Sequence, residues 1–189
     1  MDKVTIVGVG ALGSHLALFL RNHAQITVID FDRVEQKNTM SQMHPKSTVR
    51  KNKAQSMVQT MNFLFGIKLK GVPHKVTEDN VAQLLDGDLL IDCMDNGEGR
   101  RVMQAYARVC GRPLLHGALA RNGEFGRVIW DENFQIDYED GTGGATCEDG
   151  DFLPFIAVVS SYLASAAQTY LKDGKRIGYQ IYPTGATRV

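Results

Sequence analysis

The sequence predicts an α/β fold in which a doubly wound, mainly parallel sheet of the Rossmann-like kind carries an antiparallel C-terminal extension. Three observations support this prediction. Short apolar runs alternate with segments of helical periodicity along the first part of the chain. A glycine-rich turn, residues 8–13, joins the first apolar run to the first helical segment. From Phe125 onwards, apolar and polar residues alternate as they do in antiparallel strands.

The predicted parallel strands are short and mostly apolar, because a strand that is buried on both faces has little need of polar residues. The runs that meet this description are residues 4–7, 26–29, 67–72, 88–92 and 114–117. Two antiparallel strands are predicted at 125–130 and 133–136, and residues 177–182 are predicted as one last edge strand.

Apolar residues spaced three and four positions apart predict the helices between these strands. The predicted helices are residues 11–21, 50–65, 78–85 and 99–110. Polar residues interrupt the long apolar segment 152–171, so this segment is predicted to be a buried core helix and not a membrane span. We expect this helix to begin near Asp151, whose carboxylate could cap it, with Pro154 in the first turn.

Length and composition favour one domain, residues 1–189, of an ordinary soluble protein. The 21 basic and 21 acidic residues balance, so the composition gives no general attraction to nucleic acid or to an anionic membrane. A glycine-rich, acidic segment at about 138–150 is predicted to be a mobile loop. Three cysteines without a paired spacing, and a first strand that begins at once, predict a cytoplasmic protein with free thiols. Cys93 and Cys110 are expected to be inert core thiols.

The turn of residues 8–13 contains three glycines with separate predicted roles. Gly8 permits a tight bend, Gly10 lets backbone amides approach a phosphate, and Gly13 lets the helix pack closely on the sheet. Asp30, at the end of the second strand, is placed to accept hydrogen bonds from ribose hydroxyls. These residues alone fit NAD, FAD, S-adenosylmethionine and ATP equally well.

Further polar residues favour ATP over a redox cofactor. A second acid, Asp32, follows closely, and Asp95 and Asn96 come just after the fourth strand, where ligands bind in parallel sheets. Asp95 is predicted to hold the Mg²⁺ that accompanies a triphosphate. Lys53 is predicted to reach a phosphate, with Asn38 as an uncharged donor beside it. Hydride transfer needs neither group, whereas attack of a carboxylate on an α-phosphate needs both.

Each of these residues also has an ordinary structural alternative. Asp95 could cap the helix that contains Arg100, Lys53 could face solvent, and Asn38 could be a turn residue. Their occurrence in this order within one predicted fold favours the nucleotide site.

The motifs together resemble one family. The glycine turn continues into Ser14 as GVGALGS, and DFDRVEQKN (30–38), Lys53-Ala54 and DCMDNGEGR (92–100) follow. This combination resembles the ubiquitin-activating (E1-like) superfamily, and within it the adenylyltransferases of the ThiF/MoeB/HesA type in a compact single-domain form. The resemblance continues through PLLHGA (113–118) and CEDGDFLP (147–154), so it covers nearly the whole chain.

The resemblance implies a reaction in which ATP and Mg²⁺ activate the C-terminal glycine carboxylate of a small β-grasp protein. Such a ubiquitin-like or sulfur-carrier protein becomes an acyl-adenylate, and pyrophosphate is released. The resemblance assigns Asp30 to the ribose, Asp95 to Mg²⁺, and Asn38 and Lys53 to the phosphates. Cys147 matches the cysteine that in many members takes the acyl group or joins in sulfur transfer. The common assembly of the family is a homodimer.

Three features depart from the family pattern. Ser41 stands where members commonly have an arginine, and Arg50 or Arg121 are candidate substitutes for it. The usual N-terminal extension, which can supply an arginine across the dimer, is not expected here because residue 1 directly precedes the first strand. Paired CxxC motifs are missing from the sequence, so no structural zinc is expected.

Several functions remain open at the level of the sequence. The first is adenylation of a ubiquitin-like or sulfur-carrier protein, and a close variant adenylates a peptide or a small carboxylate. The second is a non-catalytic, nucleotide-binding scaffold of the same fold, which Ser41 favours. An oxidoreductase is disfavoured by Lys53 and Asp95. The sequence identifies neither the carrier protein nor the bond formed in the final product.

Overall fold

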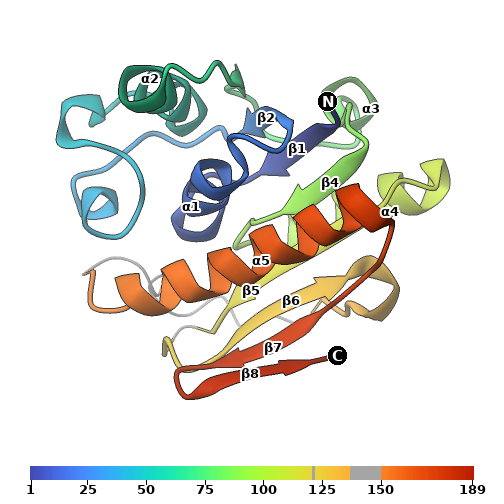
Figure 1. Ribbon diagram of the computed structural model, residues 1–189. Coiled ribbons are helices and arrows are strands. Elements are labelled where there is room, and N and C mark those ends of the chain that lie inside the picture. The colour runs from blue at the N-terminus through green and yellow to red at the C-terminus, as the bar shows by residue number, and fades with distance from the viewer. Residues whose placement is uncertain (121, 137–149) are drawn as a thin grey trace.

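The protein, seen here as a computed structural model, is described for residues 1–120, 122–136 and 150–189, and these form one sheet covered by helices (Figure 1). Its strand order is β3-β2-β1-β4-β5-β6-β7-β8. The parallel strands are β1 (Lys3–Val7), β2 (Gln25–Ile29), β3 (Lys70–Val72), β4 (Leu89–Asp92) and β5 (Leu114–Leu119). The antiparallel strands are β6 (Gly126–Trp130), β7 (Tyr179–Tyr182) and β8 (Gly185–Arg188). The predicted fold class is therefore confirmed.

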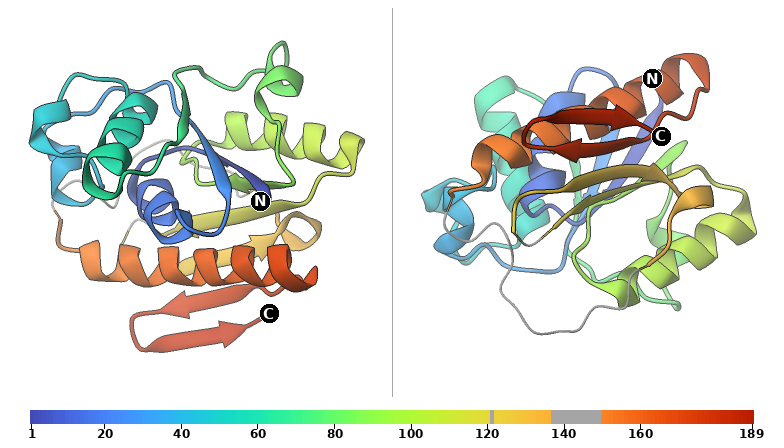
Figure 2. Two further views of the ribbon diagram at one scale, coloured as in Figure 1. Left: turned by 45° about the horizontal axis from the view of Figure 1, so that its top comes forward. Right: turned by 90° about the horizontal axis from the view of Figure 1, so that it is seen from below.

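Helices cover both faces of the sheet (Figure 2). The helices α1 (Ala11–Leu20), α2 (Lys53–Phe65) and α5 (Leu153–Asp173) pack on one face, and α3 (Val81–Leu84) and α4 (Gly97–Cys110) pack on the other. Three short 3-10 turns complete the described elements: η1 (Lys37–Met40), η2 (Lys46–Thr48) and η3 (Asp131–Asn133). Across the described ranges, none of the helices combines the length and the apolar character that a membrane crossing requires.

The helix α5 lies close to the sheet because two facing positions on the strands are glycines. A Cβ atom on Gly117 would lie 2.8 Å from Leu163 Cδ2, and one on Gly126 would lie 2.4 Å from Val159 Cγ2. Leu163 and Val159 are fully buried, and burial of one such side chain contributes about 1.5–3 kcal/mol. The glycines of β5 and β6 thus allow the core helix to bury its apolar face.

Several predicted boundaries in the first half of the fold were wrong, and the helix predicted at 78–85 is limited to α3. The helix predicted from residue 50 begins at Lys53, because Asn52 caps it by accepting a hydrogen bond from Gln55 N at 3.2 Å. The third strand covers only the last part of the predicted run 67–72.

Three predictions in the second half were also wrong. Residues 133–136 form no strand, because the chain turns in η3, where Asp131 is bound by side chains of α4. The N-cap of α5 is Phe152 and not Asp151, although Pro154 does lie in the first turn. The tail forms a hairpin in which Pro183 and Thr184 make the turn, so the sheet ends on β8 and not on β7.

Candidate nucleotide-binding site

A cavity of about 460 Å³ opens at the C-terminal ends of the parallel strands. It lies where the strand order reverses between β1 and β4, and ligands bind at this point in doubly wound sheets. Most of the residues that the sequence predicted for nucleotide or metal line the cavity. They are Gly8, Gly10, Asp30, Asp32, Asn38, Lys53, Asp95 and Asn96.

The glycine turn brings the N-terminus of α1 to this cavity. Gly8 has φ +87°, and a Cβ atom there would lie 2.8 Å from Cys93 O. Gly13 does not line the cavity. A Cβ atom added at Gly13 would lie 1.9 Å from Gly8 O, so the lack of a side chain there allows the helix to pack on the turn. Gly10 is the N-cap of α1 and supplies no capping side chain. The first amides of α1 are therefore available to an anion.

Asp30 connects the glycine turn to the loop after β2. Its Oδ2 accepts a hydrogen bond from Val9 N and its Oδ1 accepts one from Asp32 N, both at 2.8 Å. Burial raises the pKa of this carboxyl, and the opposing attraction of Lys53 and the two amide bonds does not cancel the effect. Each oxygen keeps a further lone pair, so the geometry is compatible with the predicted contact to ribose hydroxyls.

Lys53, at the start of α2, and Asn38, in η1, both line the cavity. The Lys53 side chain is only 12% exposed and its Nζ lies 3.2 Å from Asp32 Oδ2, so the alternative of a solvated lysine is wrong. Asn38 is buried in η1, where its Oδ1 accepts a hydrogen bond from Glu35 N at 2.9 Å. It is thus a turn residue as well, and its amide nitrogen is the atom left to donate to a ligand.

Asp95 and Asn96 divide their roles at the start of α4. Asn96 is the N-cap, and its Oδ1 accepts a hydrogen bond from Gly99 N at 2.8 Å. The alternative in which Asp95 caps this helix is therefore wrong. Asp95 is exposed to the cavity, and within the described part of the chain no side chain or amide bonds to its carboxylate. A free carboxylate at this place is available to a cation.

Comparison with known proteins identifies the family. The model of the ThiF family matches residues 1–181. The chain belongs to the ThiF family. It is 29% identical over 176 residues to a molybdopterin-synthase adenylyltransferase of Salmonella typhimurium, a match that covers 87% of this chain and 71% of the relative. It is 30% identical over 128 residues to a sulfur carrier protein adenylyltransferase of Thermus thermophilus, covering 62% of this chain and 45% of the relative.

The fold of this ThiF-family chain also matches solved structures. The crystal structure of E. coli MccB with ATP superimposes with a TM-score of 0.81 at 14% identity, and the match covers all of this chain and 62% of MccB. The chain thus spans less than two thirds of MccB and less than half of the Thermus relative.

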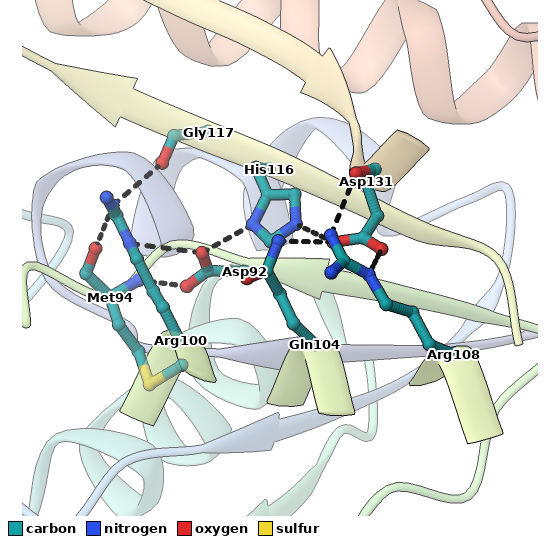
Figure 3. A network of polar contacts seen from close by, with 8 residues as sticks. All are labelled: Asp92, Met94, Arg100, Gln104, Arg108, His116, Gly117 and Asp131. Carbon is teal, nitrogen blue, oxygen red and sulfur yellow. Dashed lines mark hydrogen bonds and ion pairs between the residues drawn. The ribbon is translucent and has the colours of Figure 1, made fainter. Parts of the chain in front are cut away.

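The sequence reasoning missed a network of charged side chains beside the cavity (Figure 3). Arg100 lines the cavity, and its Nε lies 3.1 Å from Oδ2 of the fully buried Asp92. Its terminal nitrogen donates to Met94 O and, at 3.5 Å, to Gly117 O. Arg100 therefore links the end of β4 and the loop after it to β5. The motif showed Asp92 and Arg100, but it gave no sign that they are partners.

The structure does not place Arg50 where the family arginine would act. Ser41, at that position in the sequence, is buried and does not line the cavity. Arg50 lines a separate hollow of about 420 Å³, which shares only Phe31 with the nucleotide cavity. Arg121 lies outside the described residues. Besides Lys53 and Arg100, the described cations at the cavity are Lys37 and Lys75, which the sequence did not single out.

The cysteines differ from one another in their surroundings. Cys93 lines the cavity, and burial raises the pKa of its thiol well above the usual value. The raised pKa keeps the thiol protonated at neutral pH, which agrees with the inert thiol predicted from the sequence. Cys110 was predicted to be buried and is exposed, because it lies at the end of α4. Cys147, the predicted acyl or sulfur carrier, lies outside the described residues.

His44 contacts the glycine turn through Val9, a contact that the sequence did not predict. It is 2% exposed, its Nε2 donates to Val9 O at 2.8 Å, and its Nδ1 lies 2.9 Å from Ser56 Oγ. Burial lowers the pKa of His44 to about 4. The imidazole is therefore neutral in the folded protein at neutral pH.

We expect the free energy of unfolding to fall as the pH decreases from 6.5 to 4. The unfolded chain binds a proton at His44 with an ordinary pKa of 6.5, whereas the folded protein resists it until about pH 4. The unfolded state therefore binds the proton first as the pH falls. Titration of His44 alone lowers the free energy of unfolding by up to about 3 kcal/mol. Urea titrations of the wild type and of His44→Gln across this range measure the slope. The free energy of unfolding of His44→Gln should depend less on pH than that of the wild type. His23→Gln, at an exposed position, should show the wild-type slope.

Proposed function

We propose that this ThiF-family protein adenylates the C-terminal carboxylate of a small ubiquitin-like or sulfur-carrier protein, with ATP and Mg²⁺. One observation carries the proposal: an uncapped helix N-terminus, a partly buried lysine and a free carboxylate meet in one cavity at the switch point of the sheet. The names of the relatives, adenylyltransferases acting in molybdopterin synthesis and on a sulfur carrier protein, support the same reaction.

The described residues of this cavity fit a nucleoside triphosphate. The amides at the start of α1 would receive phosphate oxygens, and Asp30 would accept the ribose hydroxyls. Lys53, which forms an ion pair with Asp32, would place its charge beside the phosphates. Asn38 would donate its amide hydrogens to the same groups. Asn96 caps α4 and would act on the nucleotide only through its remaining amide nitrogen.

Asp95 fits Mg²⁺ because this ion commonly takes one or two carboxylates and fills its remaining positions with phosphate oxygens and water. In the described ranges there is no cluster of three or more acidic, histidine or cysteine side chains that could hold a metal by itself. A site with one free carboxylate agrees with a metal that arrives with its substrate. When bound, the ion would offset the negative charge that develops at the phosphates.

The chemistry then requires the carboxylate of the carrier to attack the α-phosphate, with pyrophosphate as the leaving group. Lys53 and the α1 amides stabilise charge where it develops, and their positions are set before the substrates bind. A following transfer of the acyl group, or of sulfur, to or through Cys147 is part of the proposal.

The proposed partner is a β-grasp protein with a C-terminal glycine, and the proposed assembly is a homodimer in the cytoplasm. The names of relatives from Thermus thermophilus and Haloferax volcanii, a sulfur carrier protein adenylyltransferase and a SAMP-activating enzyme, support a protein substrate. Size-exclusion chromatography with light scattering measures the assembly.

ATP–[³²P]pyrophosphate exchange tests the proposal. Candidate β-grasp proteins that end in Gly-Gly are added to the full chain with ATP and Mg²⁺, and each is compared with the same carrier lacking its last glycine. Exchange that requires the intact C-terminus supports adenylation of a carrier. Exchange with short peptides or small carboxylates, and not with the carriers, would show that the substrate is a peptide or a small carboxylate. ATP binding without exchange for any of these substrates would favour the nucleotide-binding scaffold.

Replacement of Lys53 by alanine should lower kcat for this exchange about 100-fold, as the loss of one pre-organised donor commonly does. Lys51→Ala is the matched control, because Lys51 is an exposed lysine two residues earlier that contacts Gln59 and does not line the cavity. Steady-state kinetics of both variants decide the matter. Equal rates in the two variants would remove Lys53 from the reaction.

A further inference from the structure

A fully buried histidine lies at the centre of the charged network beside the cavity (Figure 3). The Nδ1 atom of His116 lies 2.8 Å from Asp92 Oδ2, and its Nε2 atom lies 3.1 Å from Asp131 Oδ1. Phe134 stacks on the imidazole with 3.9 Å between ring centroids and 11° between the planes. His116 itself does not line the cavity, although Gly117 does.

The hydrogen-bond partners require both ring nitrogens of His116 to carry hydrogen. An ionised carboxylate only accepts hydrogen bonds. Asp131 receives hydrogen bonds from Gln104 Nε2 and Arg108 Nε, each at 2.6 Å. Burial opposes the charge of Asp131, but its bonds to His116, Arg108 and Gln104 outweigh burial and lower its pKa to about 2.

Asp92 also has donors at both of its carboxylate oxygens. Its Oδ1 accepts a hydrogen bond from Met94 N at 2.8 Å, and its Oδ2 forms the ion pair with Arg100. His116 therefore donates to a carboxylate on each side and is an imidazolium. Burial works against this charge, but the bonds to Asp131 and Asp92 raise the pKa of His116 above its ordinary value.

We propose that the His116 imidazolium, held between Asp92 and Asp131, is a positioning group that fixes the loop carrying Asp95. The inference rests on the proposed function, in which Asp95 binds Mg²⁺. His116 donates a hydrogen bond from Nδ1 to Asp92 Oδ2 and so orients this carboxylate, whose Oδ1 accepts a hydrogen bond from Met94 N.

The two residues that flank Asp95 are both anchored. Met94 is held at its amide by Asp92 and at its carbonyl by Arg100. Asn96 is held through its capping bond to Gly99 N. Asp95 has no anchor of its own in the described part of the chain, so its neighbours determine where its carboxylate points. A neutral ring at residue 116 leaves one nitrogen without a hydrogen opposite either Asp92 or Asp131, and this mismatch would weaken the hold of the ring on Asp92.

The charged groups that face the ring come from three elements. Asp92 lies at the end of β4, Asp131 in η3, and Arg100 and Arg108 on α4, one on either side of Gln104. Arg100 pairs with Asp92 and the half-exposed Arg108 pairs with Asp131, so each carboxylate that flanks the ring also has a cationic partner on α4.

The protonation state of His116 is tested first, and without any reference to adenylation. Proteins labelled with ¹⁵N-histidine are compared as wild type and His116→Gln, so that the signals of residue 116 are assigned by their loss. Both ring nitrogens should have imidazolium shifts, with retained N–H hydrogens, from pH 6 to pH 8. A nitrogen without hydrogen at pH 7 would overturn the proposal, whatever the substrate of the protein is.

The positioning role is tested by Asp131→Asn, which removes one carboxylate and keeps the size of the side chain. ATP binding is measured by calorimetry as a function of Mg²⁺ at pH 8 and pH 6. At pH 8 the variant should need about 10- to 100-fold more Mg²⁺, the range seen when a residue that orients a metal ligand is lost. The requirement should be closer to the wild-type value at pH 6 than at pH 8, because the lower pH favours protonation of the ring. ATP binding without Mg²⁺ should not change.

Glu132→Gln is the matched control, because this neighbouring acid is exposed, pairs with Arg176 and stays outside the network. A wild-type Mg²⁺ requirement in Asp131→Asn, or a defect that is the same at both pH values, would contradict the positioning role. Because the readout is binding, absence of pyrophosphate exchange would count against the proposed function alone.

Discussion

Asparagine in place of Asp95 should reduce carrier-dependent pyrophosphate exchange by about 10²- to 10³-fold, the loss expected when a group that stabilises transition-state charge is removed. The carboxylate lines the cavity and has no partner among the described residues, so the substitution removes a negative charge without breaking a structural contact. The expected defect lies in kcat and in the Mg²⁺ concentration for half-maximal rate. Binding of ATP without Mg²⁺ should persist.

Asp79→Asn is the matched control for this experiment. Asp79 is an exposed acid that lies before α3 and does not line the cavity. It should show wild-type exchange at every Mg²⁺ concentration. If Asp95→Asn keeps the wild-type rate and Mg²⁺ dependence, Asp95 is not the metal-binding acid.

Alanine in place of Gly13 should lower the free energy of unfolding by about 3 kcal/mol, near the upper end of the usual cost of overpacking a core. The new Cβ would lie 1.9 Å from Gly8 O, a backbone atom that cannot move by a change of rotamer. Gly8 in turn has φ +87° and lies against the backbone of Cys93, so the turn has little room to shift. Urea unfolding followed by circular dichroism measures the effect.

Gly10→Ala separates packing from ligand binding in the same turn. The atom nearest to its new Cβ would be Gln42 Nε2 at 3.9 Å, so the stability should change by less than about 1 kcal/mol. Because Gly10 lines the cavity, the added methyl group should instead weaken ATP binding. A wild-type stability for Gly13→Ala, or a large loss for Gly10→Ala, would contradict this division of roles.

The two sets of variants address different parts of one arrangement. The glycine turn sets how closely α1 approaches the sheet, and therefore where its amides lie. The loop after β4 sets where Asp95 lies relative to those amides. A nucleotide site at the switch point of a doubly wound sheet needs both, because the two loops follow neighbouring strands and both line the cavity.

The amino-acid sequence by itself determined the fold class, the order of most of the elements and eight of the residues that line the cavity. It could do so because these properties are local or follow from topology. Apolar runs and helical periodicity report burial along one element. In a parallel sheet, the C-terminal ends of all strands lie at one edge, so residues that follow different strands, such as Asp30 and Asp95, are brought together without knowledge of any contact. Element boundaries were less well determined, because caps such as Asn52 compete with several neighbouring candidates.

Only the tertiary structure decided which charged side chains are partners. His116 is 24 residues from Asp92 and 15 from Asp131, and nothing in the sequence distinguishes these acids from the others as its neighbours. The same holds for His44, whose contact with Val9 spans 35 residues. The energy of a buried charge depends on the distance and number of its partners and on the exclusion of water. These quantities exist only once helices and strands have packed, which is why the site's lining could be predicted and the network that supports it could not.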